Sequence, residues 1–272
     1  MFFEYRCYRG RKMVIIIYFF IVVFATCIGS AAGLGGGVII KPLFDLLGFH
    51  TMNVIGLYSA ISLFFMSITS IYKQYKNKAK FNIRVSVLMA IGSILGGLTG
   101  DYIFSFVYET FGPFTKVIQN SLLSIVLLII ILYTLKKDKI KNHHVKSSIV
   151  IAIIGFLLGN LSVFLGIGGG PITLAILSFL FSFTSKESGV LYSCIIFFSQ
   201  STKIITTYVK TNFVGYDLSV VPFIIVAALI GGYVGAMINK RMTNKQVDKL
   251  YIGILSCLIV LALINIATEL FA

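Results

Sequence analysis

The chain is poor in charge and lacks the motifs of the common enzyme classes. Only 12% of its 272 residues are charged, about half of the roughly 25% that is usual in soluble domains. Asp and Glu number nine in all, and they form no cluster within an apolar run. HExxH, a plausible Ser/His/Asp set and a Walker A motif are absent. These absences argue against an enzyme and against an ATP-driven pump.

Cysteine and histidine supply no metal-binding pattern. Cys7, Cys27, Cys194 and Cys257 lie far apart, without CxxC spacing. The pair His143–His144 falls in a basic loop, where histidines are usually solvated. We therefore predict no metal and no cofactor.

Apolar runs long enough to cross a bilayer, about 20 residues each, recur along the whole chain. They cover residues 13–32, 84–106, 117–135, 147–165, 186–209, 218–238 and 250–268. The other segments are short, except 33–83, which itself contains a glycine motif, a short apolar segment and a further long apolar stretch, so no segment remains for a soluble domain. The sequence predicts an all-α polytopic protein of the cell membrane.

The net charge of +14 lies in short loops beside these runs. In such loops Lys and Arg set the topology and face anionic lipid, whereas a nucleic-acid site needs a folded basic face. The predicted partner is the lipid bilayer and not nucleic acid.

The basic residues before the apolar run 13–28 imitate a signal peptide. A similar run with a glycine motif recurs internally at 147–170, where no signal peptidase would act. We therefore expect the N-terminal run to be the first membrane helix and not a cleaved signal peptide.

The chain contains an internal repeat. Gly33-Leu-Gly-Gly-Gly37 recurs 133 positions later as Gly166-Ile-Gly-Gly-Gly170. Further matches are Gly56 with Gly189, at the same offset, and Gly96-Gly97-x-x-Gly100 with Gly231-Gly232-x-x-Gly235, at an offset of 135. We predict two membrane repeats, 13–136 and 147–272, with a cytoplasmic basic tail 1–12 and a cytoplasmic basic linker 137–146.

Equivalent loops of the two repeats differ in charge, which indicates inversion. Loop 73–84 is strongly basic and its partner 207–217 is not, whereas 240–249 is basic and its partner 107–116 is not. Basic loops stay cytoplasmic, so equivalent loops fall on opposite sides, as in inverted-repeat transporters. If segment 171–184 crosses, there are nine crossings; if it and 38–49 are both re-entrant, there are eight.

The two glycine motifs predict broken helices near the bilayer midplane. Each glycine costs a helix roughly 1 kcal/mol against alanine, and a broken backbone persists in a membrane only when buried in protein or lining a wet cavity. The N–H groups of the helix that follows favour an anion. We therefore predict substrate-lining roles for Gly33, Gly35, Gly36, Gly37, Gly166, Gly168, Gly169 and Gly170, with close packing as the alternative. For Gly92, Gly96, Gly100, Gly231 and Gly235 we predict packing.

Two lysines stand out as intramembrane charges. Lys41 follows the first break, and Lys203 lies inside the run 186–209. Ionisable groups at such depth usually face an interior or a watery path. We predict that at least one of them attracts an anionic substrate, with snorkelling as the alternative for Lys203.

The pattern GLGGGVIIKPLF (33–44), repeated as GIGGGPITLAIL (166–177), resembles the paired signature of the sulfite exporter TauE/SafE family. The resemblance covers about residues 13–270. It implies a multi-pass carrier, an exporter of small sulfur-containing anions such as sulfite or organosulfonates, with the glycine breaks lining the site. Lys41 departs from the apolar residue that is usual before the first proline.

A secondary transporter of small anions is therefore the predicted function. The alternatives are a non-transporting subunit of a larger membrane complex and, with less support, a membrane-embedded enzyme. A coupling ion and a homo-oligomer are both compatible with a carrier.

Overall fold

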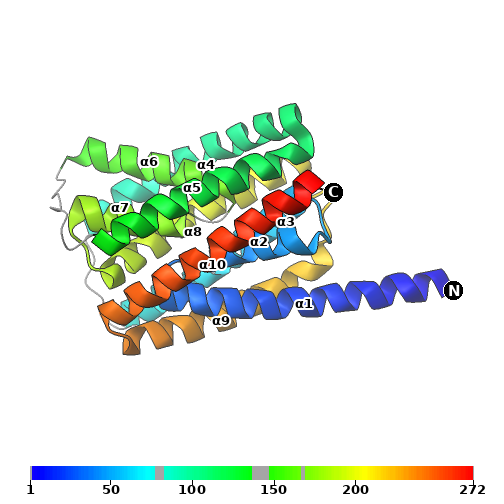
Figure 1. The fold of residues 1–272 in the computed structure, drawn as a ribbon, viewed down its shortest axis with the longest axis horizontal. Coiled ribbons are helices and arrows are strands. Elements are labelled where there is room, and N and C mark those ends of the chain that lie inside the picture. The colour runs from blue at the N-terminus through cyan, green and yellow to red at the C-terminus, as the bar shows by residue number, and fades with distance from the viewer. Residues whose placement is uncertain (1, 77–82, 137–146, 167–168, 272) are drawn as a thin grey trace.

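The computed structural model describes residues 2–76, 83–136, 147–166 and 169–271. These residues form helices joined by short connections (Figure 1). The first half contains α1 (Phe2–Ala32), α2 (Gly37–Leu47), α3 (Met52–Lys76), α4 (Ile83–Phe111), the 3-10 turn η1 (Gly112–Phe114) and α5 (Thr115–Lys136). The second half contains α6 (Ser148–Leu165), α7 (Gly170–Phe181), α8 (Ser185–Thr211), η3 (Leu218–Val220), α9 (Val221–Arg241) and α10 (Asn244–Phe271).

The helices have the length and composition of membrane spans. Among the described residues, six segments are long and apolar enough to cross a membrane: Lys12–Ala32, Met52–Lys76, Arg84–Lys136, Ser148–Leu165, Leu218–Arg241 and Asn244–Leu270. Large apolar side chains such as Phe20, Leu128 and Ile149 remain exposed on the outer faces, as contact with lipid requires. The predicted all-α polytopic membrane class is confirmed.

Helix α2 turns back along α1 after the first glycine motif. The ring of Tyr18 in α1 stacks on Phe44 in α2, with centroids 3.8 Å apart. The Tyr18 hydroxyl also lies 3.0 Å from Nδ1 of His50, just beyond the end of α2. The end of α2 therefore lies beside the middle of α1, and these two helices form a hairpin.

Helix α7 does not cross the molecule either. Its 12 residues span about 18 Å at 1.5 Å per residue, short of the ~30 Å hydrocarbon core. The chain reverses at Ser182, whose φ is 57°, and α8 begins three residues later. The nine-crossing topology, in which 171–184 crosses, therefore does not hold.

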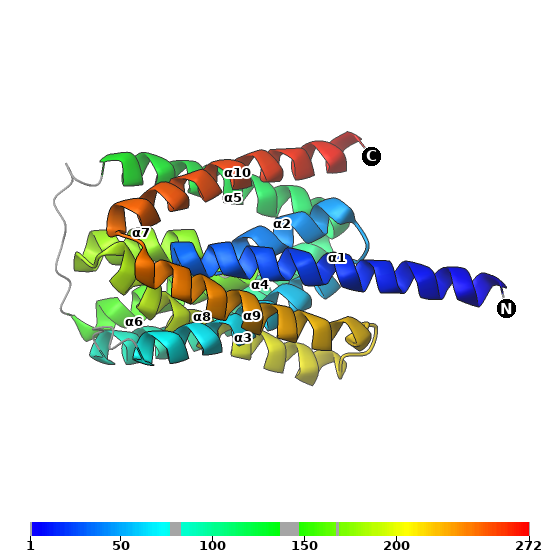
Figure 2. The same ribbon diagram turned by 90° about the horizontal axis from the view of Figure 1, so that it is seen from below.

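Glycine stripes bring helices from different halves together. Helix α4 packs along α6, and α1 packs along α9 (Figure 2). A Cβ atom at Gly96 or Gly100 would strike the backbone of α6, and one at Gly235 would strike the backbone of α1. These stripes, with Gly92 and Gly231, let the helix backbones approach closely, so their predicted packing role is confirmed.

The two ends of the molecule carry different connections (Figure 1). One end holds the helix termini that flank the basic loops 73–84, 136–146 and 240–249. The connections α2–α3, α4–α5 and α8–α9 lie at the other end, together with both chain termini. The N-terminal end of α1 and the helix termini that flank the three basic loops thus lie at opposite ends.

Candidate functional site

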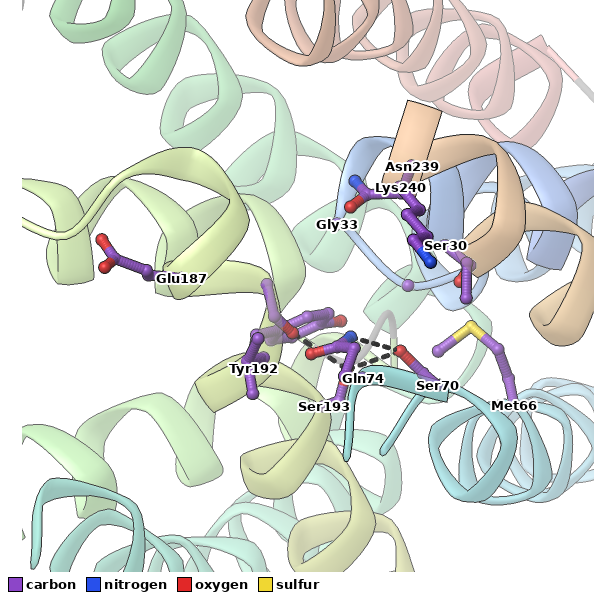
Figure 3. A pocket seen from close by; sticks show the side chains of 14 residues that line it. Ser30, Gly33, Met66, Ser70, Gln74, Glu187, Tyr192, Ser193, Asn239 and Lys240 are labelled. Atoms are coloured by element: carbon purple, nitrogen blue, oxygen red, sulfur yellow. Dashed lines mark hydrogen bonds between the residues drawn. The ribbon is translucent and has the colours of Figure 1, made fainter. Parts of the chain in front are cut away.

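A cavity of about 350 Å³ lies beside the first glycine break (Figure 3). It lies toward the C-terminal ends of α3 and α9, which flank the basic loops 73–84 and 240–249. The end of α1, the C-terminal halves of α3 and α9, and the first turns of α8 surround it. Its size falls within the usual range for small-ligand sites. The lining residues are Ser30, Gly33, Gly35, Met66, Ser70, Gln74, Glu187, Gly189, Val190, Tyr192, Ser193, Ala236, Asn239 and Lys240.

Hydroxyl and amide groups from α3 and α8 meet on one wall of this cavity. The hydroxyls of Ser70 and Ser193 lie 2.9 Å apart, and the Gln74 amide donates to Ser70 over 2.8 Å. Ser193 also donates to the Gly189 carbonyl. The Gln74 carbonyl oxygen has no hydrogen-bond partner among the described residues. This wall can rearrange to donate hydrogen bonds inward, because hydroxyl and amide rotors can be redirected.

The hydroxyl of Tyr192 is a second polar group of the lining residues that has no partner among the described residues. The residue is 1% exposed, and its oxygen has no hydrogen-bond partner among the described residues. A Cβ atom at Gly35 would lie 2.7 Å from this oxygen, and one at Gly170 would lie 2.8 Å from it. Both glycine motifs therefore reach the same tyrosine. A buried hydroxyl without a partner costs about 1–3 kcal/mol, which an acceptor in the cavity would remove.

The carboxylate that lines the cavity is already engaged. One oxygen of Glu187 accepts from the backbone and hydroxyl of Thr184 at 2.9 Å each, which caps the start of α8. The Asn239 amide donates to the Ala31 carbonyl over 2.6 Å and closes the end of α1. Lys240 is exposed at the rim. Among the described residues Lys240 has no ion-pair partner, so its charge can face an arriving anion.

The glycines of the first break have two different surroundings. Gly33 and Gly35 line the cavity, with φ of 75° and 70°, where glycine is favoured. Gly36 lies instead against the backbone of Thr26, and Gly37 against Leu63. The N–H groups of residues 33–35 donate back to α1 carbonyls. No residue of α2 lines the cavity, so the N–H groups at the start of this helix lie outside it. The hydrogen-bond donors of the cavity are therefore side chains.

The second break packs onto the first. A Cβ atom at Gly170 would strike the carbonyl of Leu34, and one at Gly169 would lie 3.2 Å from Ser162. At Gly166 it would lie 2.8 Å from Cδ of Lys41. Gly168 lies outside the described residues. The structure thus brings the two motifs together, with the second motif behind the wall of the cavity.

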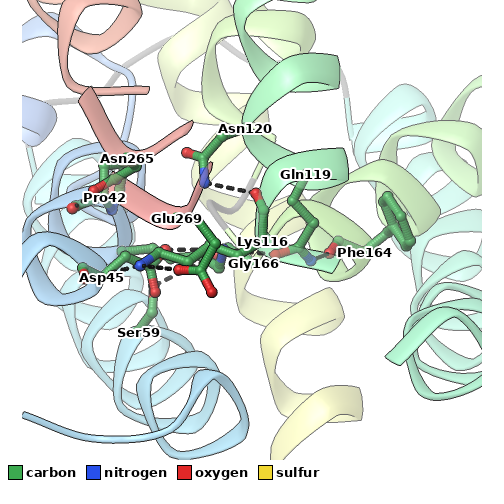
Figure 4. A network of polar contacts seen from close by, with 11 residues as sticks. Pro42, Asp45, Ser59, Lys116, Gln119, Asn120, Phe164, Gly166, Asn265 and Glu269 are labelled. Atoms are coloured by element: carbon green, nitrogen blue, oxygen red, sulfur yellow. Dashed lines mark hydrogen bonds and ion pairs between the residues drawn. The ribbon is translucent and has the colours of Figure 1, made fainter. Parts of the chain in front are cut away.

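Lys41 belongs to a buried polar network rather than to the cavity. Figure 4 shows Asp45, Gln119 and Phe164 of this network. Its amino group lies 3.3 Å from Asp45 and donates to the Gln119 carbonyl oxygen over 2.8 Å. The Gln119 amide donates in turn to the Phe164 carbonyl, near the second break. Both members of the Lys41–Asp45 pair are nearly fully buried. The lysine charge is therefore matched inside the protein.

Lys203 has a different environment. It is 6% exposed, and its amino group lies 5.4 Å from the ring centroid of Phe104. It lines a second cavity of about 130 Å³ between α3, α4 and α8. Among the described residues no hydrogen-bond or ion-pair partner holds its charge. Lys41 does not line this second cavity.

Sequence reasoning did not select Tyr192, Ser70 or Gln74. Tyrosine and serine are ordinary packing residues of membrane helices, and only the fold shows that these side chains share a cavity. One signal was present: Ser70 lies 133 positions before Lys203, the same offset that relates the two glycine motifs.

Comparisons with known proteins agree with this architecture. The family model described as "Sulfite exporter TauE/SafE" matches residues 18–262. The chain is 27% identical over 252 residues to "Probable membrane transporter protein YunE" of Bacillus subtilis (strain 168). The alignment covers 82% of this chain and 88% of that protein. No solved structure matches the chain. Because the family model spans most of its length, this multi-pass membrane protein belongs to the sulfite exporter TauE/SafE family.

Proposed function

We propose that the protein is a secondary transporter of small anions, with its substrate site in the cavity beside the first glycine break. The observation that carries this proposal is Tyr192, which lines the cavity and whose buried hydroxyl has no hydrogen-bond partner among the described residues. A hydroxyl can donate to an anion, and hydrogen bonds to charged groups are stronger than neutral ones. Ser70, Ser193 and Gln74 add further groups around it, and Lys240 supplies positive charge at the rim.

The two halves support a carrier built from inverted repeats. Equivalent helices run in opposite directions: α1 against α6, α3 against α8, and α5 against α10 (Figure 1). Partners are also exchanged, since α1 packs on α9 and its equivalent α6 packs on α4. Such repeats place the substrate near the midplane, between the broken helices, where Gly170 meets the first break.

Small sulfur-containing anions, such as sulfite or organosulfonates, are the proposed substrates. The family description supports this class. Their oxygens accept several hydrogen bonds at once, which suits a wall of hydroxyl and amide donors. The cavity of about 350 Å³ leaves room for a short organic chain beside the sulfonate.

We assign the end with the three basic loops to the cytoplasm. The cavity lies toward that end, which supports a state that receives anions from the cytoplasm and a transport direction of export. Under this assignment the tail 1–12 lies on the outer side. The basic residues of the tail predicted a cytoplasmic position for it. We propose the outer side instead, because three basic loops favour the opposite end as the cytoplasmic one.

The test is flux into proteoliposomes across a panel of sulfite, organosulfonates, sulfate and chloride. We expect saturable uptake of a sulfonate or sulfite, reduced by competing sulfonates. Lys41→Met should leave the apparent anion affinity unchanged, since Lys41 is held by Asp45 and Gln119. Pure protein without flux of any anion would favour the alternative of a non-transporting membrane subunit.

A further inference from the structure

We infer that the second cavity, around Lys203, is a second site for the same anion, at the opposite end of the transport path. This inference rests on the proposed transport function. It starts from the relation between the two cavities, which the internal repeat makes explicit. Of the eleven residues that line the second cavity, six are repeat equivalents of residues that line the first.

The equivalences fall on the same helices in each half. On α3 and α8, at an offset of 133, the pairs are Gly56 with Gly189, Ser70 with Lys203, and Gln74 with Thr207. On α4 and α9, at an offset of 135, they are Asp101 with Ala236, Phe104 with Asn239, and Ser105 with Lys240. The two cavities are therefore one structural feature present twice, once at each end.

In this structure the second cavity is the smaller of the two, about 130 Å³ against about 350 Å³. An ion pair joins α8 to α4 beside it, with the Lys210 amino group 2.6 Å from Asp101. Alternating access in an inverted-repeat carrier exchanges the open and closed ends. The second cavity is then the closed counterpart of the first, and the Lys210–Asp101 pair holds α4 and α8 together there.

Lys203 gives the second cavity its specificity. Where the first cavity has the Ser70 hydroxyl, the second has an amino group that is buried and without an ion-pair partner among the described residues. A Cβ atom at Gly56 would lie 3.2 Å from Nζ of Lys203, so this glycine leaves space beside the charge. A buried ammonium needs a counter-charge, and its contact with the Phe104 ring compensates only in part. Asp101 also lines this cavity, but its carboxylate is paired with Lys210. A small oxyanion would give Lys203 an ion-pair partner of its own.

The experiment uses repeat-equivalent cysteines. Gln74→Cys reports on the first cavity and Thr207→Cys on the second, each in a protein whose four native cysteines are replaced. The purified proteins in detergent are labelled with a maleimide, with 2-hydroxyethanesulfonate as the probe anion, because sulfite itself adds to maleimides. We expect the probe to slow labelling at both positions.

Lys203→Met then separates the two sites. We expect the probe concentration that halves labelling at position 207 to rise about tenfold or more, because a hydrogen bond to a charged group is lost. The probe concentration that halves labelling at position 74 should change less than twofold. Lys116→Met is the control, since this lysine pairs with Glu269 and lines neither cavity. Lys203→Arg, which keeps the charge, should retain protection at 207.

Two results would overturn the inference. The first is protection at position 74 alone. The second is equal protection at position 207 in the protein with Lys203 and in the Lys203→Met variant, when thermal unfolding shows that both proteins are folded. Either result leaves the carrier function intact. Absence of protection at both positions, together with absence of flux in proteoliposomes, would remove the proposed function as well.

Discussion

Two buried tyrosines differ in whether their hydroxyl groups have a hydrogen-bond partner. The Tyr251 hydroxyl donates to the Pro171 carbonyl over 2.8 Å, whereas the Tyr192 hydroxyl has no partner among the described residues. Both residues are almost completely buried. Burial alone therefore does not explain why position 192 carries an oxygen, whereas the proposed anion in the adjacent cavity would.

Tyr192→Phe should weaken anion transport without weakening the fold. Loss of a hydrogen bond to a charged ligand, about 1.5–3 kcal/mol, should raise the apparent KM by about tenfold or more. The melting temperature should stay constant or rise, because a buried unsatisfied hydroxyl is removed. Flux in proteoliposomes and thermal unfolding in detergent measure the two effects.

Tyr251→Phe is the matched control for this prediction. It removes a satisfied hydroxyl, so it should cost about 1 kcal/mol of stability and leave KM unchanged. A Tyr192→Phe protein with normal KM would show that the hydroxyl does not face the substrate.

The glycines of the two motifs act mainly through close contact between the breaks. A Cβ atom at Gly170 would strike the Leu34 carbonyl and lie 2.8 Å from the Tyr192 oxygen. Gly170→Ala should therefore destabilise the protein by about 1–3 kcal/mol through overpacking. Gly253→Ala is the control, because nothing lies within 4 Å of its added methyl group. Thermal unfolding compares them, and equal melting temperatures would contradict the tight contact.

At the scale of helices, adjacent glycines of α4 have different tasks. A Cβ atom at Gly96 would strike the carbonyl of Phe156 in α6, whereas one at Gly97 would lie 3.4 Å from Thr202, an ordinary contact. We predict that Gly96→Ala costs about 1–3 kcal/mol by forcing α4 from α6. Gly97→Ala should be neutral or stabilising, since alanine favours helix by about 1 kcal/mol.

Thermal unfolding of the two purified variants tests this prediction. Flux should fall with stability in Gly96→Ala and stay near normal in Gly97→Ala. If Gly96→Ala were as stable as the parent, α4 and α6 would not be held together by the glycine stripe.

Helix positions could be read from the sequence, but helix partners could not. The run 186–209 predicted α8 (Ser185–Thr211) within two residues at each end, because apolar length determines a membrane helix. The break before Gly37 was also predicted, since three consecutive glycines disfavour a helix. The return of α7 at Ser182 was missed in the nine-crossing topology, because a short apolar segment has the same composition whether it crosses or turns back.

The candidate site shows the same limit. Gly33 and Gly35 were predicted to line the site and do line a cavity, because a glycine motif is visible locally. Tyr192 was not selected, since its importance arises from contacts with Gly35 and Gly170, which are distant in the sequence. Hydropathy alone does not distinguish Lys41 from Lys203, because both lie in or beside apolar segments. Only the fold shows that Asp45 and Gln119 hold the first lysine, while the second faces a cavity.

At the scale of the whole molecule, the arrangement of the ends makes a topology that can be tested. The helix ends at Lys76, Arg241 and Asn244 lie together, and the N-terminus and the α8–α9 connection lie at the other end (Figure 1). With the basic loops in the cytoplasm, single cysteines at positions 8 and 212 should face outward. Single cysteines at 76 and 245 should face the cytoplasm.

A membrane-impermeant maleimide applied to intact cells should therefore label cysteines at 8 and 212 and spare those at 76 and 245. Permeabilised cells, in which all four should react, provide the control for exposure. Labelling at 245 but not at 212 would reverse the orientation and put the larger cavity on the outer side, so that the structure would represent a state open to the outside. Labelling at 212 without labelling at 8 would contradict the hairpin of α1 and α2 itself. That hairpin returns the chain to the end at which α1 began, so both glycine breaks can meet in the interior while each half is approached from a different side.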